Sequence, residues 1–282
     1  MKKLLTKKTS LNCRGQLLDI SKPVVMGILN ITPDSFYDGG KYSEKEKVQQ
    51  RLNQMIDEGA TLVDIGAYSS RPGSTHISEK EELGRLIPVL ELIVKFFPDL
   101  IVSVDTFRSG IASLVVNKYG VSIINDISAG ELDHKMFETI NKLQVPYIMM
   151  HMKGNPKNMQ SNTQYKNMIK EIIAYFSKKV NKLKEIGVRD LIIDPGFGFS
   201  KTILQNYQLL KNLKQFEIFG FPILAGISRK SMIYNHLGID AKNALNGTSI
   251  LNTVALQNGA NILRVHDIKE ALEVINLVEL VQ

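Results

Sequence analysis

Polar residues close a series of short apolar runs in this chain, and they are of types that bind or react with small molecules. Carboxylates and amides end some of the runs, and cationic side chains or histidine end others. These residues are Asn30, Asp64, Asp105, Asn125, His151, Asp194, Lys230, Arg264 and His266. Any one of them could be the N-cap of a following helix. A repeated set is harder to explain in that way, and it favours a functional site.

The acids and amides suit a different part of a ligand from the cations. Carboxylates and amides together accept and donate hydrogen bonds in one plane, as binding a flat ring with N–H donors and a carbonyl requires. The residues of this kind are Asp105, Asn125 and Asp194. Cations suit a phosphate or pyrophosphate. The candidates for that role are Arg71, Arg264 and His266.

Lys230 begins a predicted helix, where the helix dipole disfavours a positive charge. It therefore needs a nearby carboxylate or an anionic ligand, and Asp194 on the neighbouring strand can supply the carboxylate; an exposed lysine is the alternative. Ser231 can present its hydroxyl and backbone N–H to a carboxylate. Asp126, next to Asn125, is expected to turn outward or to cap.

Two segments beside these strand ends are predicted to be loops that cover a substrate. Residues 31–41 contain Phe36 and two glycines, and residues 67–77 contain Arg71-Pro72-Gly73. Loops with glycine at such a position often order over the substrate and exclude water, although ordinary surface turns have similar sequences.

The apolar runs are predicted to be eight parallel strands, because they are rich in Val and Ile and near-continuously apolar. They are Val24–Ile28, Leu62–Ile65, Ile101–Val104, Val121–Ile124, Tyr147–Met150, Leu191–Ile193, Ile223–Ile227 and Ile262–Val265. Amphipathic segments alternate with them, including 163–187, 243–258 and 267–281. Capping boxes at Ser43–Glu46 and Ser78–Glu81 predict two helix starts.

Eight strand–helix units predict an α/β fold, the (β/α)₈ or TIM barrel, in which the carboxyl ends of the strands converge on one mouth. We expect a single domain over residues 1–282, with its core at about 22–282 and a short β-hairpin at 11–20. A doubly wound open sheet is the alternative, but no G-x-G-x-x-G motif follows the first strand.

Composition excludes several classes of protein. No apolar run reaches the roughly 18 residues of a membrane span, and Leu4-Leu5 is followed at once by Thr6-Lys7-Lys8, which leaves no secretory h-region. The single cysteine, Cys13, allows no internal disulfide. The net charge is +7, without the basic aromatic stripe or zinc spacing of nucleic-acid-binding proteins. We expect a cytoplasmic protein with small-molecule partners, and neither nucleic acid nor a membrane.

The strand-end segments, taken together, resemble the dihydropteroate synthase family. They occur in the family's order from about residue 12 to the carboxyl end, and eight motifs in register are highly specific. The segments are Met26–Phe36 with Asp38-Gly39-Gly40, Ser70–Gly73, Ser103–Thr106, Asn125–Ser128, Met150–Gly154, Asp194–Phe199, Ser228–Ser231 and Arg264–His266.

The resemblance implies a transferase of folate biosynthesis on a (β/α)₈ barrel. It would join (7,8-dihydropterin-6-yl)methyl diphosphate to 4-aminobenzoate, giving 7,8-dihydropteroate and pyrophosphate. It also implies Mg²⁺ as cofactor, sulfonamides as inhibitors and a homodimer, for which the 243–281 region is apolar enough.

The family's site residues carry over to three groups of positions. The pterin would be bound by Asp105, Asn125, Met150, Asp194, Lys230 and Arg264. The diphosphate would be bound by Asn30, Arg71, Arg264 and His266, with Asn30 also reaching Mg²⁺. The aminobenzoate site would consist of Phe36, Ser70, Pro72, Phe199 and Ser231.

The resemblance further implies an SN1-like order, in which pyrophosphate leaves before the amine attacks. Negative charge would then build beside the cations and Mg²⁺. Positive charge would build on the pterin methylene, where Asp105 could stabilise it. The expected catalytic residues are Asp105, Lys230 and Arg264. The aromatic amine is a free base at neutral pH, so no general base is required.

Two positions depart from the family pattern. Tyr68 stands where many members have an acid, and Ser70 replaces the usual threonine, so contacts with aminobenzoate and sulfonamides are expected to shift. A pterin-binding methyltransferase-type barrel serving a corrinoid protein is a second hypothesis, but it would need no diphosphate site. A non-catalytic pterin-binding paralogue and a generic phosphate-binding barrel also stay open.

Overall fold

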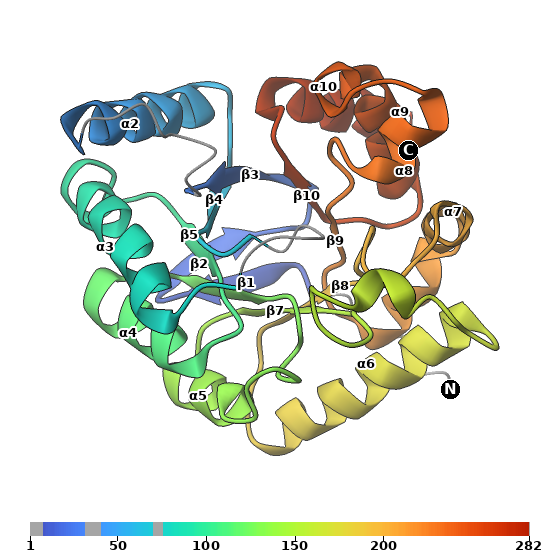
Figure 1. Ribbon diagram of the computed structural model, residues 1–282, viewed down its shortest axis with the longest axis horizontal. Helices are drawn as coiled ribbons and strands as arrows, with labels where there is room; N and C mark the ends of the chain where they lie inside the picture. Colours follow the sequence, from blue (N-terminus) through green and yellow to red (C-terminus); the bar gives the residue numbers. More distant parts are fainter. Residues whose placement is uncertain (1–7, 32–40, 70–75, 282) are drawn as a thin grey trace.

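The computed structural model of the chain describes residues 8–31, 41–69 and 76–281. Eight parallel strands form its centre, in the order β8-β7-β6-β5-β4-β3-β10-β9 (Figure 1). A bridge between Ile193 and Ile223 joins the two ends of this sheet. The strands are β3 (Val24–Asn30), β4 (Leu62–Gly66), β5 (Val102–Asp105), β6 (Ile123–Asp126), β7 (Tyr147–Met150), β8 (Leu191–Asp194), β9 (Leu224–Ala225) and β10 (Ile262–Val265). The predicted (β/α)₈ barrel is therefore confirmed, and the alternative, a doubly wound open sheet, is wrong.

Helices follow the strands and cover the outside of the barrel (Figure 1). They are α2 (Lys41–Asp57), α3 (Glu79–Phe96), α4 (Ser109–Tyr119), α5 (Met136–Leu143), α6 (Met168–Glu185), α7 (Ile203–Lys211), α8 (Ser231–Leu237), α9 (Leu245–Gln257) and α10 (Ile268–Glu279). Short 3₁₀ helices lie at η1 (Met159–Ser161), η2 (Leu213–Phe219) and η3 (Ala241–Asn243). Alternate strand residues, such as Val63 and Ile65 of β4, pack into the apolar layer beneath the helices.

The inside of the barrel has an apolar floor at the amino ends of the strands. It is built by one or two residues on or directly before each strand: Val24, Met26, Leu62, Ile101, Ile123, Ile148, Ile192, Leu224 and Ile262. The predicted hairpin, β1 (Ser10–Cys13) and β2 (Gln16–Asp19), packs Leu11, Cys13 and Leu18 against this floor. Burial raises the pKa of Cys13 to about 12, so its thiol stays protonated, as expected of a structural residue.

The predicted helix starts are corrected in two places. Ser43 lies inside α2 rather than before it, so the capping box there is wrong. Ser78 does cap α3, because its Oγ accepts the N–H of Glu81 at 3.2 Å. The Glu81 carboxylate pairs with Arg85 one turn later, at 2.7 Å, so this box is only half formed. A complete capping box stands instead at Thr202, before α7.

Other boundaries shift for local reasons. β9 is only two residues long, because the chain turns after it and the Lys230 N–H donates to the carbonyl of Ile227 at 3.1 Å. The α6 helix begins at Met168 rather than near 163, because Asn167 caps it by accepting the N–H of Lys170.

Candidate functional site

A mostly polar layer lies directly above the apolar floor. Inward-facing residues recur every second position along a strand, so the residue two places after each floor residue lies one layer nearer the carboxyl ends. This layer contains Asp64, Ser103, Asn125, Met150, Asp194, Gly226 and Arg264. Four of the residues predicted to bind a flat ring therefore share one layer, and Asp105 and Asn30 lie one step above it.

A hydrogen-bonded network crosses the barrel within these layers. Arg264 on β10 donates from Nε to Asp64 Oδ2 at 2.7 Å and from Nη2 to Asp105 Oδ2 at 3.3 Å. Asn125 on β6 donates from Nδ2 to the same Asp64 oxygen at 3.0 Å. Arg264 thus contacts Asp105 directly and is linked to Asn125 through Asp64. Sequence reasoning counted Asp64 among the polar residues of the strand ends but gave it no role in the site, although a carboxylate inside an apolar strand is a signal for such a role.

Asp105 has an unusual protonation equilibrium. Burial, followed by the charge of Asp64, raises the pKa of Asp105 to about 8, against the lowering effect of Arg264. At pH 7 the protein without ligand therefore holds a proton on Asp105 for most of the time. A positive charge developing on a ligand beside it would favour the ionised form.

Lys230 and Asp194 both form hydrogen bonds with the backbone of the loop that follows β8. The Lys230 ammonium donates to the carbonyl of Phe197, and it lies 4.8 Å from the ring centroid of Phe199. The charge of Asp194 acts on Lys230 through space, while the Asp194 carboxylate accepts the N–H of Gly196 at 2.8 Å. Burial lowers the pKa of Lys230 to about 8 and raises that of Asp194. The predicted cap position of Lys230 is confirmed, but its direct partner is Phe197 rather than Asp194.

Lys201 fixes this loop, and no motif in the sequence had pointed to it. Its buried ammonium donates to the carbonyls of Gly196 and Phe199, at 2.8 and 2.9 Å, and lies 3.2 Å from Nδ1 of His151. Burial lowers the pKa of Lys201 to about 7. Burial and the charge of Lys201 lower the pKa of His151 to about 2, so His151 is neutral. Gly196 has φ +76°, and a Cβ there would lie 2.1 Å from the His151 carbonyl oxygen, so only glycine fits.

Met150 belongs to an apolar wall at the carboxyl ends of the strands. The wall contains Phe107, Ile127, Met150, Met152 and Met159, with Tyr68 and Phe199 packed against it. A flexible thioether in such a wall suits contact with a flat ring. Phe199 therefore touches both this wall and, through its ring face, the Lys230 ammonium.

Asn30, His266 and Ser231 lie at the mouth. Asn30 ends β3 opposite Gly66, where a Cβ would lie 3.2 Å from Asn30 Oδ1, so glycine leaves room for the amide oxygen. The His266 ring lies 3.0 Å from Ser228 Oγ through Nδ1, and Ser231 is the first residue of α8. The other predicted residues, Phe36, Ser70, Arg71 and Pro72, lie outside the described residues, as do most of the two predicted covering loops.

Tyr68, which stands where many family members were expected to have an acid, contacts two described side chains. Its hydroxyl is 3.2 Å from Nδ1 of His76, and its ring meets Phe107 edge-on at a centroid distance of 5.2 Å. The residues that flank segment 70–75 are therefore joined to each other.

Asp126 faces outward from the barrel interior, as expected, because Asn125 beside it faces inward and its own carboxylate meets Tyr147 of the outer apolar layer. It is fully buried, and its carboxylate accepts the N–H groups of Ser128 and Gly130 and the hydroxyl of Tyr147, at 2.7, 2.8 and 2.6 Å. The capping expectation is correct, although Asp126 caps a loop rather than a helix.

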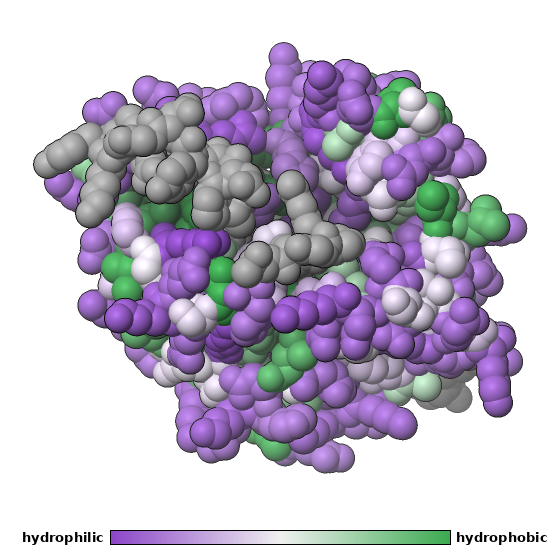
Figure 2. All heavy atoms as spheres, in the orientation of Figure 1, coloured by the Kyte–Doolittle hydropathy of each residue, from purple (hydrophilic) through white to green (hydrophobic). Residues whose placement is uncertain are grey.

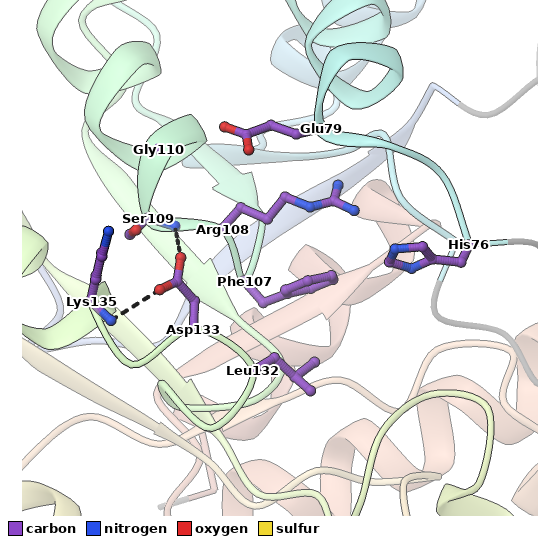
Figure 3. A pocket seen from close by; sticks show the side chains of 9 residues that line it. All are labelled: His76, Glu79, Phe107, Arg108, Ser109, Gly110, Leu132, Asp133 and Lys135. Atoms are coloured by element: carbon purple, nitrogen blue, oxygen red, sulfur yellow. Dashed lines mark hydrogen bonds between the residues drawn. The ribbon is translucent and has the colours of Figure 1, made fainter.

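A separate cavity of about 530 Å³ lies beside α3 and α4 (Figure 3). Two of its charged groups are already paired: Asp133 accepts the N–H groups of Ser109 and Lys135 at 2.7 and 2.9 Å, and Arg108 pairs with Glu82. It contains none of the predicted site residues. Within the described part of the chain, no group of three His, Cys, Asp or Glu residues could hold a metal ion, and no described helix is long and apolar enough to cross a membrane.

Comparisons with known proteins identify the family of this chain. The family model described as "Pterin binding enzyme" matches residues 26–266. Dihydropteroate synthase of Haemophilus influenzae is 42% identical over 92% of this chain and 94% of its own, and that of Escherichia coli K12 is 41% identical over 94% of each. The Yersinia pestis dihydropteroate synthase in complex with a sulfonamide drug superposes with a TM-score of 0.89 at 39% identity, over 96% and 98% of the two chains. The Xanthomonas albilineans enzyme with 4-aminobenzoic acid gives 0.88 at 35% identity, over 98% and 99%.

Proposed function

The chain belongs to the dihydropteroate synthase family of pterin-binding enzymes, and from that premise we propose how its residues share the reaction. The reaction joins (7,8-dihydropterin-6-yl)methyl diphosphate to 4-aminobenzoate and releases pyrophosphate. The observation that carries our assignment is the polar layer above the apolar floor, where Asp64, Asn125, Asp105 and Arg264 form one network. A flat, polar ring fits such a layer, because its edge finds donors and acceptors while its faces meet apolar groups.

The pterin ring lies in this layer. Asn125 and Asp194 bind its edge, and Met150 and Arg264 pack on its faces. The pKa of Lys230 is about 8, so its side chain is mostly protonated at pH 7. Its ammonium donates a hydrogen bond to the ring on the side that faces the aminobenzoate. Phe199 and Ser231, together with Phe36, Ser70 and Pro72, form the aminobenzoate site.

Arg264 and Asp105 act on the two charges that develop as the diphosphate leaves. Two nitrogens of Arg264 are engaged by carboxylates, which leaves Nη1 for a ligand oxygen; Arg71, His266 and Asn30 complete the diphosphate site. As positive charge grows on the pterin methylene, Asp105 releases its proton to solvent, and the resulting carboxylate stabilises that charge. The amine of aminobenzoate then attacks this carbon, and its excess proton passes to solvent.

Mg²⁺ fits the residues at this mouth. Magnesium keeps several waters and is commonly held by one or two protein oxygens together with substrate phosphates, so the amide oxygen of Asn30 beside Gly66 is a sufficient protein ligand. When bound, the ion would neutralise charge on the departing pyrophosphate.

We propose a homodimer that forms through the region of α8–α10. The exposed apolar side chains there include Leu237, Ile250, Leu277, Leu280 and Val281. Figure 2 shows hydrophobic surface at the upper right, where Figure 1 places α8 and α9. In sedimentation velocity, Leu277→Glu should lower the fraction of dimer. Leu204→Glu, which charges an equally exposed position on α7, serves as the control. We also propose that residues 1–282 form a single domain and that the protein is cytoplasmic. Sulfonamides are proposed to bind at the aminobenzoate site.

The function is tested by measuring pyrophosphate release from the dihydropterin diphosphate with Mg²⁺, with and without 4-aminobenzoate. We expect release that rises with aminobenzoate, together with dihydropteroate as product. Pterin binding without release would indicate a non-catalytic pterin-binding barrel instead. Omitting Mg²⁺ and adding EDTA should lower the rate; an unchanged rate would contradict the metal assignment.

A further inference from the structure

We infer that Asp64 is a positioning residue, which orients Asn125 and Arg264 toward the pterin without itself binding the substrate. This inference rests on the proposed function, because it presupposes that those two residues bind the ring. It adds a residue of the barrel interior that acts through its neighbours.

The two carboxylate oxygens of Asp64 have different surroundings. The side chain is fully buried on β4, and a single oxygen, Oδ2, accepts both the Nε–H of Arg264 at 2.7 Å and the Nδ2–H of Asn125 at 3.0 Å. The other oxygen, Oδ1, has no hydrogen-bond partner among the described residues. A buried carboxylate with an unpartnered oxygen is costly for stability, which indicates a role other than stability.

Asp64 determines which atom Asn125 offers to the ligand. The Oδ2 atom of Asp64 accepts hydrogen bonds here, so the Asn125 side chain turns its NH₂ group toward Asp64. The amide oxygen is then directed away from Asp64. Asn125 therefore meets the ligand as an acceptor, which suits an N–H group on the edge of a pterin.

Asp64 also fixes the plane of the Arg264 guanidinium. Asp64 holds Nε and Asp105 holds Nη2, and two contacts at different nitrogens leave a planar group no freedom to rotate. Without Asp64, Arg264 would be attached at one nitrogen only, by the longer, 3.3 Å contact.

Because Arg264 and Asn125 both donate to the same oxygen of Asp64, two substitutions of Asp64 can test the positioning role. In Asp64→Asn the amide oxygen can occupy the position of Oδ2 and accept both bonds, whereas Asp64→Leu removes both at similar volume. Binding of 6-hydroxymethylpterin is measured by calorimetry, with thermal unfolding to verify the fold. We expect Asp64→Asn to stay within about threefold of the wild type and Asp64→Leu to bind at least about tenfold more weakly. Asp126→Asn, a buried carboxylate that faces away from this network, should leave pterin affinity unchanged.

Equal losses in Asp64→Asn and Asp64→Leu, or no loss in either, would overturn the inference. If Asp64→Leu does not fold, Asp64→Ser, which is too short to reach both donors, takes its place in the comparison.

A double-mutant cycle separates this inference from the proposed function. Asn125→Ala alone should weaken pterin binding, and adding Asp64→Leu should then cost less than Asp64→Leu costs in the wild type, because part of its effect acts through Asn125. Fully additive losses would contradict positioning by Asp64. An Asn125→Ala variant with unchanged affinity would instead refute the assignment of Asn125 under the proposed function.

Discussion

Replacing Asp105 with asparagine should stabilise the folded protein at neutral pH while slowing the reaction. The pKa of Asp105 is raised to about 8 by burial and by the Asp64 carboxylate, so the folded state keeps a proton that the unfolded chain releases at about pH 4. Because the native state binds more protons than the unfolded state, the free energy of unfolding contributed by this group falls as pH rises from about 4 to about 8. The amide of Asp105→Asn carries no ionisable proton and avoids this loss.

The size of the effect follows from the shift. Each pKa unit corresponds to about 1.4 kcal/mol, which sets an upper bound of about 4 kcal/mol at pH 7 for a group displaced this far. The Asp105 side chain is 16% exposed, and solvent reduces the cost, so we expect a gain of about 1–3 kcal/mol. The amide oxygen can still accept the 3.3 Å contact from Arg264, so no new unpaired group offsets this gain.

Urea unfolding of the wild type and of Asp105→Asn at pH 5, 6, 7 and 8 measures this difference. The stability difference should grow with pH in favour of the variant. Turnover of the variant should fall by about a hundredfold, because no carboxylate remains to stabilise the pterin methylene. A stability difference that is independent of pH, or a variant less stable than the wild type at pH 8, would refute the reasoning about the Asp105 proton.

Three further substitutions test the assigned roles. Asp194→Asn, which removes a buried carboxylate from the ring layer, should weaken pterin binding by about tenfold or more, and calorimetry showing unchanged affinity would contradict that role. Lys230→Ala should raise the KM of both substrates, because its ammonium lies between the Phe197 carbonyl and the Phe199 ring; a normal rate at low substrate concentrations would count against it. Arg71→Ala should lower turnover and leave pterin affinity intact, so loss of pterin binding would show that Arg71 does not belong to the diphosphate site.

Several features could be read from the sequence because they depend on local chemistry. Near-continuous apolar runs predicted the eight strands, since strands covered on both faces have no solvent-facing residues. The positions of Asn125, Asp194 and Arg264 at or near the ends of these runs then predicted that they lie at the mouth of the barrel. The N-cap position of Lys230 and the packing role of Cys13 follow from the same kind of reasoning.

Other features depend on distances between strands that are far apart in the sequence. Asp64 and Arg264 are separated by 200 residues, and only closure of the barrel brings the guanidinium onto that carboxylate. Lys201 likewise looked like an ordinary loop residue, because nothing in its neighbours reveals that it would be enclosed by two carbonyls and His151.

The sequence by itself determined which residue types line the mouth of this barrel, because side-chain direction in a strand is a local property. The tertiary structure alone decided which of them share a proton or a hydrogen bond. Those pairings, and the raised pKa of Asp105 that follows from them, depend on burial and on through-space charge. Both arise only when the eight strand ends meet above the apolar floor.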